Sequence, residues 1–201
     1  MQSAVIMASG VSARYNEAGG GSQNKLLLPF GGKTVIEAVI SALPDNLSKK
    51  LVVTRSTRIA ELSHRNGCTA VLHSKPCRAD TIRLGLAYSK GARGCLFLVG
   101  DQPLLSRASV ERILAEAKRH PQSIVRLRSG ETEGNPVWFP ETLFPALSAL
   151  EQNETGAQVI KNSGAEIRYV EADSPHELLD IDTPRDYELL LELLKARQSN
   201  I

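Results

Sequence analysis

Short apolar runs alternate with longer amphipathic segments along the first two thirds of this chain, and this alternation limits its fold more than any other feature. Short apolar runs bounded by small or turn-forming residues are typical of buried strands. The predicted strands are residues 3–8, 50–54, 69–73 and 94–101. Apolar residues recur with helical spacing in the segments 34–43, 56–67, 79–91 and 106–120. This order predicts an α/β fold, a doubly wound and mostly parallel sheet with helices on both faces.

The last third of the chain has a less regular pattern. It predicts extended segments at 123–128, 135–140 and 167–171, and helices at 140–150, 155–164 and 183–198. Pro184 falls in the first turn of the last helix, where proline is well tolerated. At 201 residues the chain is long enough for one full core, and no linker or repeat divides it. We therefore expect one domain covering residues 1–201.

Composition excludes several classes of partner. The formal net charge of +2 is too small to predict nucleic acid or a membrane surface as a bulk partner. No apolar run approaches the roughly 20 residues of a membrane span, and the first residues lack the basic region of a signal peptide. Cys68, Cys77 and Cys95 are odd in number and form no CxxC pair, which indicates free thiols in a reducing cytoplasm. We expect a cytoplasmic protein that binds neither nucleic acid nor membrane.

Small residues, cations and carboxylates follow the predicted strands. Ligands of doubly wound sheets bind at the carboxyl ends of the strands, near the point where the strand order reverses. The residues expected at this edge are Ala8, Ser9, Gly10, Ser12, Arg14, Lys25, Ser74, Lys75, Arg78, Gly100, Asp101, Gln102, Pro103, Asp180 and Asp182. Cations suit phosphate oxygens, and carboxylates hold the divalent metal that bridges phosphates. The pattern predicts a site for a nucleoside triphosphate and a divalent metal.

The two familiar glycine-rich phosphate loops do not fit this chain. The segment "GGKT" supplies the end of a Walker A loop, but Leu27 stands where that motif needs its first glycine. A dinucleotide fingerprint beginning at Gly19 fails because Asn24 occupies the place of its third glycine. The phosphate-binding loop must therefore be of another kind.

Four segments together resemble the MobA-like nucleotidyltransferases. The segment "MASGVSARYN…NKLLLPFGGKTVIEAVI" resembles the signature loop of that family, and "LVGDQPLLS" resembles its metal-binding turn. "GNPVWFP" and "LLDIDTPRDYE" resemble two later elements, and all four occur in the family's order along nearly the whole chain. The sequences Ala8-Ser9-Gly10 and Gly100-Asp101-Gln102-Pro103 are most similar to the cytidylyltransferase branch and to accessory proteins of molybdenum hydroxylases.

The resemblance implies a Rossmann-like fold of the GT-A nucleotidyltransferase type and a CTP-dependent reaction. CMP would pass to the terminal phosphate of molybdopterin or its molybdenum form, with release of pyrophosphate. Residues 1–105 would bind the nucleotide, and residues 106–201 would form the acceptor side. Magnesium, or manganese, would be the cofactor. A molybdenum hydroxylase would be a further partner.

The resemblance also assigns roles to individual residues. Arg14 would bind the β- and γ-phosphates and Lys25 the α-phosphate, while Asp101 would hold the metal with Asp182 as a second ligand. These assignments make Lys25, Arg14 and Asp101 the catalytic residues. The nucleotide-binding residues would be Ala8, Ser9, Gly10, Ser12, Arg14, Lys25 and Gly100. Asn135 would lie towards the acceptor.

Several alternatives remain open at this stage. The enzyme could use GTP, or a sugar or polyol phosphate as acceptor, or the chain could be a non-catalytic carrier of the molybdenum cofactor. Asp101 could instead cap a helix at Ser106, Asp182 could cap the last helix, and Asp180 could be the metal ligand. The four histidines lack metal spacing, which favours structural or surface roles. The long segment 15–24 contains three consecutive glycines, so we expect it to be mobile without nucleotide and to close on binding.

Overall fold

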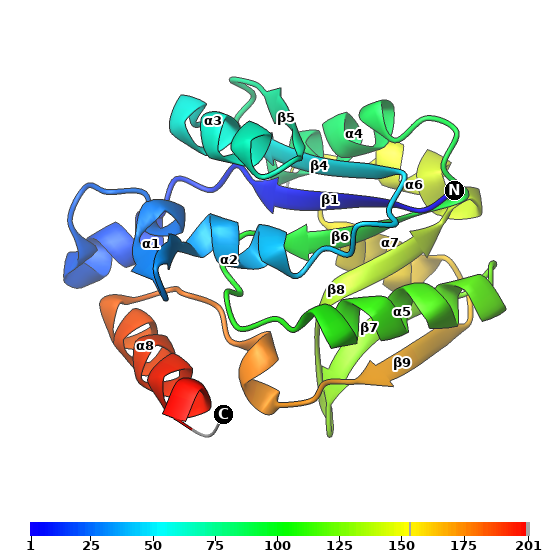
Figure 1. Ribbon diagram of the computed structural model, residues 1–201. Helices are drawn as coiled ribbons and strands as arrows, with labels where there is room; N and C mark the ends of the chain where they lie inside the picture. Colours follow the sequence, from blue (N-terminus) through cyan, green and yellow to red (C-terminus); the bar gives the residue numbers. More distant parts are fainter. Residues whose placement is uncertain (153, 200–201) are drawn as a thin grey trace.

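The computed structural model describes residues 1–152 and 154–199. A seven-stranded sheet of order β5-β4-β1-β6-β8-β7-β9 forms its centre (Figure 1). The strands are β1 (Ser3–Ala8), β4 (Lys49–Thr54), β5 (Thr69–Leu72), β6 (Gly94–Val99), β7 (Ile124–Ser129), β8 (Thr132–Pro140) and β9 (Ile167–Glu171). Neighbouring strands are parallel except at β8, which runs antiparallel to β6 and β7. The predicted α/β class and mostly parallel sheet are confirmed.

Helices cover both faces of the sheet, as the alternation predicts. One face carries α2 (Val35–Ser41), α3 (Thr57–Arg65), α5 (Arg107–Arg119) and α8 (Pro184–Ser199), and the other carries α4 (Arg78–Tyr88), α6 (Phe144–Ser148) and α7 (Gly156–Asn162). Neighbouring side chains of a strand point to opposite faces. Ile6 of β1 therefore packs in the first core and Val5 in the second. Both faces of the sheet are buried, which explains why its central strands are apolar at nearly every position.

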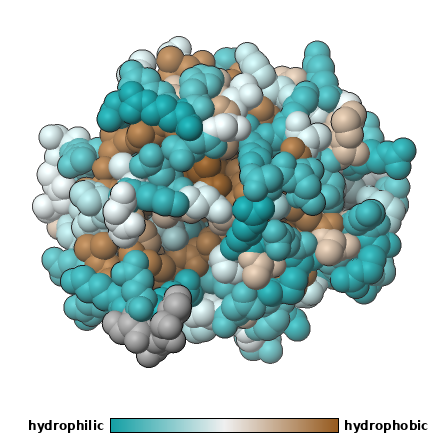
Figure 2. All heavy atoms as spheres, in the orientation of Figure 1, coloured by the Kyte–Doolittle hydropathy of each residue, from teal (hydrophilic) through white to brown (hydrophobic). Residues whose placement is uncertain are grey.

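Polar and charged residues cover most of the surface seen in Figure 2, with smaller apolar areas between them. Within residues 1–152 and 154–199, no helix is both long and apolar enough to cross a membrane.

One local feature differs from the sequence-based prediction, and a second, a small hairpin, was not predicted. The predicted helix 140–150 is divided into a 3-10 turn (Glu141–Leu143) and α6, where Pro145 cannot donate a backbone hydrogen bond to the preceding turn. The segment "GGKT" lies in a small antiparallel hairpin of β2 (Pro29–Phe30) and β3 (Lys33–Thr34). Gly31 and Gly32 have φ values of 58° and 79°, as the commonest two-residue hairpin turn requires. These glycines therefore shape a turn, and the Walker-like sequence forms no phosphate loop.

The glycine-rich segment after β1 follows a helical path. Its elements are α1 (Ala13–Tyr15) and a π-helical turn (Asn16–Gly20), followed by a 3-10 turn (Lys25–Leu27). Tyr15 is 5% exposed, and a Cβ atom added to Gly20 would lie only 2.1 Å from its ring. Gly20 therefore leaves room for Tyr15 to pack against the segment and into the core.

A buried carboxylate fixes the segment that precedes α8. Glu177 lies in a 3-10 turn (Pro175–Leu178) and is 0% exposed. Its Oε2 accepts a hydrogen bond of 3.0 Å from the backbone N–H of Ser106, and its Oε1 accepts one of 3.2 Å from that of Asp173. Ser106 is the N-cap of α5, where a negative charge also interacts favourably with the helix dipole. Glu177 thus joins the C-terminal part of the chain to the start of α5.

Replacement of Glu177 by alanine should lower the free energy of unfolding by about 2–4 kcal/mol. The substitution removes the buried carboxylate that accepts hydrogen bonds from two backbone N–H groups, and each donor left without its acceptor costs about 1–3 kcal/mol. Urea unfolding followed by circular dichroism measures the change. Glu177→Gln should cost less because one oxygen remains, and Glu192→Ala, at an exposed position of α8, should have little effect. Equal stability of Glu177→Ala and Glu192→Ala would contradict this role.

Candidate nucleotide and metal site

The predicted site lies where β1 and β6 end side by side. From β1 the chain forms β4 and β5 on one side and then returns to form β6 on the other, so the strand order reverses between β1 and β6. The backbone N–H of Gly100 donates a hydrogen bond of 3.1 Å to the carbonyl of Met7. A Cβ atom on Gly100 would lie 3.1 Å from Leu26 and 3.3 Å from the carbonyl oxygen of Met7. The glycine therefore allows the turn that carries Asp101 to pass close to β1.

Two cations and two carboxylates meet at this edge. The Nζ of Lys25 lies 2.6 Å from Oδ2 of Asp101 and 3.5 Å from Oδ1 of Asp182, and it donates a hydrogen bond of 2.5 Å to the carbonyl of Ile181. The Nη1 of Arg14 lies 2.5 Å from Oδ2 of Asp182. The Lys25 side chain is 13% exposed and that of Arg14 is 67% exposed. Lys25 is thus held inside the cluster, and Arg14 lies at its mouth.

Ser12 brings the two cations together across the long segment between them. It has a left-handed backbone with φ 57°, which is uncommon for a residue with a side chain. Its Oγ accepts a hydrogen bond of 3.0 Å from the backbone N–H of Lys25. Such strained residues gather at functional sites, where the surrounding structure holds them in place. The length of the segment therefore does not separate Arg14 from Lys25, since both contact Asp182.

Asp182 is not the cap of the last helix. The Oγ1 of Thr183 accepts a hydrogen bond of 3.2 Å from the backbone N–H of Asp186, and the Asp186 carboxylate accepts one of 2.7 Å from that of Thr183. These reciprocal bonds form a capping box. The Asp182 carboxylate is left to bind cations.

Asp101 does not cap a helix either. Ser106 caps α5 through its own side chain, which accepts a hydrogen bond of 3.0 Å from the backbone N–H of Ser109. The carbonyl of Asp101 instead accepts a hydrogen bond of 3.1 Å from the backbone N–H of Ile181. This bond fastens the turn that carries Asp101 to the segment that carries Asp182.

A third carboxylate makes the edge more acidic. Asp180 is solvent exposed on one side, but the protein packed around its carboxyl, followed by the negative charges of Asp101 and Asp182, raises its pKa to about 6. A hydrogen bond with Gln102 and the charge of Lys25 oppose this rise in pKa. The repulsion among the three carboxylates favours a bound cation at this edge.

The carboxylates fit a metal that binds together with a nucleotide. In the part of the chain that the structure describes, no group of three or more His, Cys, Asp or Glu residues could hold a metal ion alone. Magnesium in nucleotide sites is ordinarily held by one or two carboxylates together with substrate phosphates. Asp101 and Asp182 both have an oxygen near one cation, the ammonium of Lys25, which shows that they converge on a common point.

The residues directly after β1 lie on the other side of that strand, over β4 and β5. Ser9 Oγ donates a hydrogen bond of 3.1 Å to the carbonyl of Val53 and lies 2.8 Å from Nε2 of His73. Gly10 is exposed, and no atom lies within 4 Å of the position that its Cβ would occupy. Ala8 is buried, and its carbonyl accepts a hydrogen bond of 3.0 Å from the hydroxyl of Thr54. Sequence reasoning did not single out His73; the available signal was its place at the end of the predicted strand 69–73, at the same edge of the sheet as the other candidate residues.

Asn135 reaches the same edge through the antiparallel strand. In the pairing of β8 with β6, Val137 lies opposite Phe97, so Asn135 lies near the carboxyl end of β6. A Cβ atom on Gly134 would lie 2.6 Å from Leu178, so this part of β8 packs closely against the segment before α8. The structure thus places Asn135 at the edge that holds Asp101, on the side away from Ser9.

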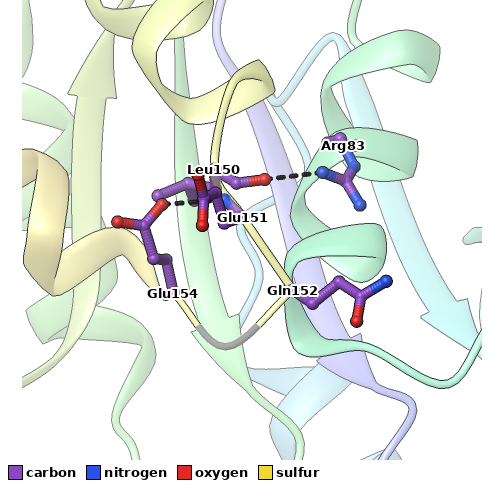
Figure 3. A pocket seen from close by; sticks show the side chains of 5 residues that line it. All are labelled: Arg83, Leu150, Glu151, Gln152 and Glu154. Atoms are coloured by element: carbon purple, nitrogen blue, oxygen red, sulfur yellow. Dashed lines mark hydrogen bonds between the residues drawn. The ribbon is translucent and has the colours of Figure 1, made fainter.

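Two cavities lie away from the charged cluster. One of about 590 Å³ lies between α4 and the segment after α6 and is lined by Arg83, Leu150, Glu151, Gln152 and Glu154 (Figure 3). Arg83 donates a hydrogen bond of 2.6 Å to the carbonyl of Leu150 there. The other, of about 580 Å³, includes Gln2 and Arg107 near the amino end of β1. Neither of these two cavities includes a predicted site residue.

Known proteins similar to this chain include two curated relatives. The purine catabolism protein PucB of Bacillus subtilis is 29% identical over 208 residues, which cover 92% of this chain and 94% of that protein. A molybdenum cofactor guanylyltransferase of Mesorhizobium japonicum is 26% identical over 215 residues, which cover 97% of both chains.

Solved structures have the same fold. A nucleotidyl transferase from Methanothermobacter has a TM-score of 0.84 and 26% identity, over 98% of this chain and 99% of that one. A Mycobacterium tuberculosis protein solved in complex with manganese has a TM-score of 0.72 and 24% identity, over 95% of this chain and 98% of that one.

The family match covers most of the fold and most of the candidate site. The model of the MobA-like NTP transferase domain matches residues 4–168, a range that runs from the second residue of β1 through β8 to the second residue of β9. Lys25, Arg14 and Asp101 lie inside the match, and Asp182 lies beyond it. The chain belongs to the MobA-like NTP transferase family.

Proposed function

We propose that this protein transfers CMP from CTP to the terminal phosphate of molybdopterin or its molybdenum form and releases pyrophosphate. The observation that carries this proposal is the convergence of Lys25, Arg14, Asp101 and Asp182 at the carboxyl ends of β1 and β6. The names of the relatives, one a purine catabolism protein and one a molybdenum cofactor transferase, support an acceptor of this class. A molybdenum hydroxylase would then receive the product.

The proposed chemistry depends on charge and position. Lys25, which is held within the cluster, would bind the α-phosphoryl group, and the exposed Arg14 would close on the β- and γ-phosphates. Asp101 and Asp182 would hold a magnesium or manganese ion, which neutralises charge on the phosphates when bound. The acceptor phosphate is already anionic, so attack on the α-phosphorus requires no general base. Positioning and electrostatic stabilisation then supply most of the catalysis.

The two sides of the edge would bind different substrates. Residues 1–105 would hold the nucleotide, with Ala8, Ser9, Gly10, Ser12 and Gly100 beside the base, ribose and phosphates. Residues 106–201 would form the acceptor side, with Asn135 towards the pterin phosphate. The position of Asn135 beyond β6, opposite to Ser9, supports this division.

Guanylyl transfer is the second candidate function, because one relative is a guanylyltransferase. The choice between CTP and GTP depends on the base, whereas the charged cluster would bind the phosphates of either nucleotide. A carrier without catalytic activity is less well supported, because a carrier has no need for two cations and two carboxylates that converge at one point.

The nucleotide and the acceptor can be identified by measuring pyrophosphate release. The protein is incubated with CTP, GTP, ATP or UTP and with magnesium or manganese, in the presence and absence of molybdopterin. We expect metal-dependent release with CTP that requires the acceptor and is lost in Asp101→Asn. Release with GTP alone would contradict the cytidylyl assignment. Tight molybdopterin binding without release of pyrophosphate would favour the carrier.

Replacement of Lys25 by alanine should lower kcat by about 100-fold or more. The ammonium is the less exposed of the two cations of the cluster, and loss of one such charge-stabilising group typically costs about 10²–10³ in kcat. Steady-state kinetics with the nucleotide found above measures the loss. Lys33→Ala removes the lysine of "GGKT", which lies on the hairpin and bonds to Ser41, and should leave kcat unchanged. An equal loss in both variants would contradict the role of Lys25.

Replacement of Arg14 by alanine should raise the KM for the nucleotide by about tenfold with a smaller change in kcat. Its guanidinium is largely exposed and lies at the mouth of the cluster, where it would contribute mainly to binding the terminal phosphates. The same kinetic assay separates KM from kcat. A loss confined to kcat would show that Arg14 acts on the reacting phosphate instead.

A further inference from the structure

A chain of hydrogen bonds crosses the carboxyl ends of β5, β4 and β1. The backbone N–H of Lys75 donates to Nδ1 of His73 at 3.1 Å, and Nε2 of His73 lies 2.8 Å from Oγ of Ser9. Ser9 Oγ in turn lies 3.1 Å from the carbonyl of Val53. This series of hydrogen bonds ends at the nucleotide side of the edge and lies outside the charged cluster.

The two ends of this series of hydrogen bonds determine the donors and acceptors between them. The Lys75 backbone N–H can only donate, so Nδ1 of His73 is the acceptor and carries no proton. A neutral imidazole then has its proton on Nε2, which donates to Ser9. The carbonyl of Val53 can only accept, so it receives the hydroxyl proton of Ser9.

Two conclusions follow for Ser9. His73 cannot take a proton from Ser9, because the nitrogen facing the hydroxyl already carries one. The pair is therefore not an activated serine nucleophile. The hydroxyl has also used its single donor, so the lone pair that remains can only accept a hydrogen bond. Ser9 is half-buried, and open space lies beside it at Gly10, where a ligand has room.

We propose that His73 is a positioning residue that fixes Ser9 as an acceptor for the 4-amino group of cytosine and so excludes uracil. This inference rests on the proposed function, in which Ser9 lies beside the base. Cytosine has an amino donor at the position where uracil has a keto acceptor. A hydroxyl that can only accept distinguishes cytosine from uracil, because the keto oxygen of uracil would place its lone pairs against those of the hydroxyl. A ribose hydroxyl can rotate to donate or accept and would not be discriminated in this way.

The surroundings of His73 keep it neutral. Burial is the main cause that lowers its pKa below the usual 6.5, and the charges of Arg55 and Lys75 act in the same direction. The carboxylate of Asp80 on α4 opposes them, but it is paired with Arg83 at 2.7 Å. A lowered pKa means that the neutral form dominates above pH 6.5. Protonation at lower pH would place a proton on Nδ1, facing the Lys75 N–H, and would break the chain.

The test is the ratio of kcat/KM for CTP to that for UTP. We expect a ratio of at least about 100 in the unaltered protein and a fall of at least about tenfold in Ser9→Ala and in His73→Phe. UTP should be used better in His73→Phe, since the freed hydroxyl can donate to the keto group. His73→Gln, whose amide nitrogen can donate at the position of Nε2, should restore part of the ratio. When the pH is lowered below 6.5, the ratio should decrease in the unaltered protein and stay constant in His73→Phe.

Controls separate this inference from the function on which it depends. His64→Phe, at an exposed position on α3, should leave the ratio unchanged. If Ser9→Ala and His73→Phe lower the use of CTP and UTP equally, His73 has only a structural role and the inference is wrong while the function stands. The inference is also wrong if the ratio of kcat/KM for CTP to that for UTP in these two variants equals the ratio in the unaltered protein. If the protein uses GTP but neither CTP nor UTP, both the inference and the proposed function are wrong.

Discussion

The ammonium of Lys25 is the contact on which the candidate site depends. It joins three parts of the chain that are far apart in sequence: the loop after β1, the turn after β6 and the segment before α8. Like charges on Asp101, Asp180 and Asp182 would repel one another at this edge, and the lysine compensates for that repulsion. The same cation keeps two carboxylates aimed at a common point. The protein thus uses one of its own charges to hold the geometry that a nucleotide and its metal would require.

The segment before α8 completes this arrangement although it belongs to none of the strands. Glu177 binds the start of α5, and the backbone N–H of Ile181 binds the turn that carries Asp101. Gln102, only 2% exposed, donates a hydrogen bond of 3.2 Å to the carbonyl of Leu178. These contacts place Asp182 beside Asp101 with little freedom. The functional edge is therefore built from both ends of the chain.

Sequence patterns predicted the sheet and its helices because apolar periodicity reports burial directly. They also predicted which charged residues share an edge, since parallel strands end together. They could not decide whether Asp101 and Asp182 cap helices. The answer depends on whether a neighbouring hydroxyl, such as that of Ser106 or Thr183, already accepts from the free N–H groups of the helix. Nor could they identify His73, whose role follows from a backbone N–H and a hydroxyl that meet only after folding. Contacts between residues distant in sequence carry the information that periodicity lacks.

The reversed direction of β8 has a consequence for how such a fold can diversify. β7 runs in the same direction as β6, and β8 runs antiparallel to both. The turn between β7 and β8, at Gly130, therefore lies at the same edge of the sheet as the charged cluster. This turn is far in sequence from the loop after β1, and β6 separates β1 from β8 in the sheet. Residues could be inserted there to reshape this side of the edge while Arg14 and Lys25 stay in place. The antiparallel strand thus gives the sheet a turn that can vary in sequence without a change in the loop after β1.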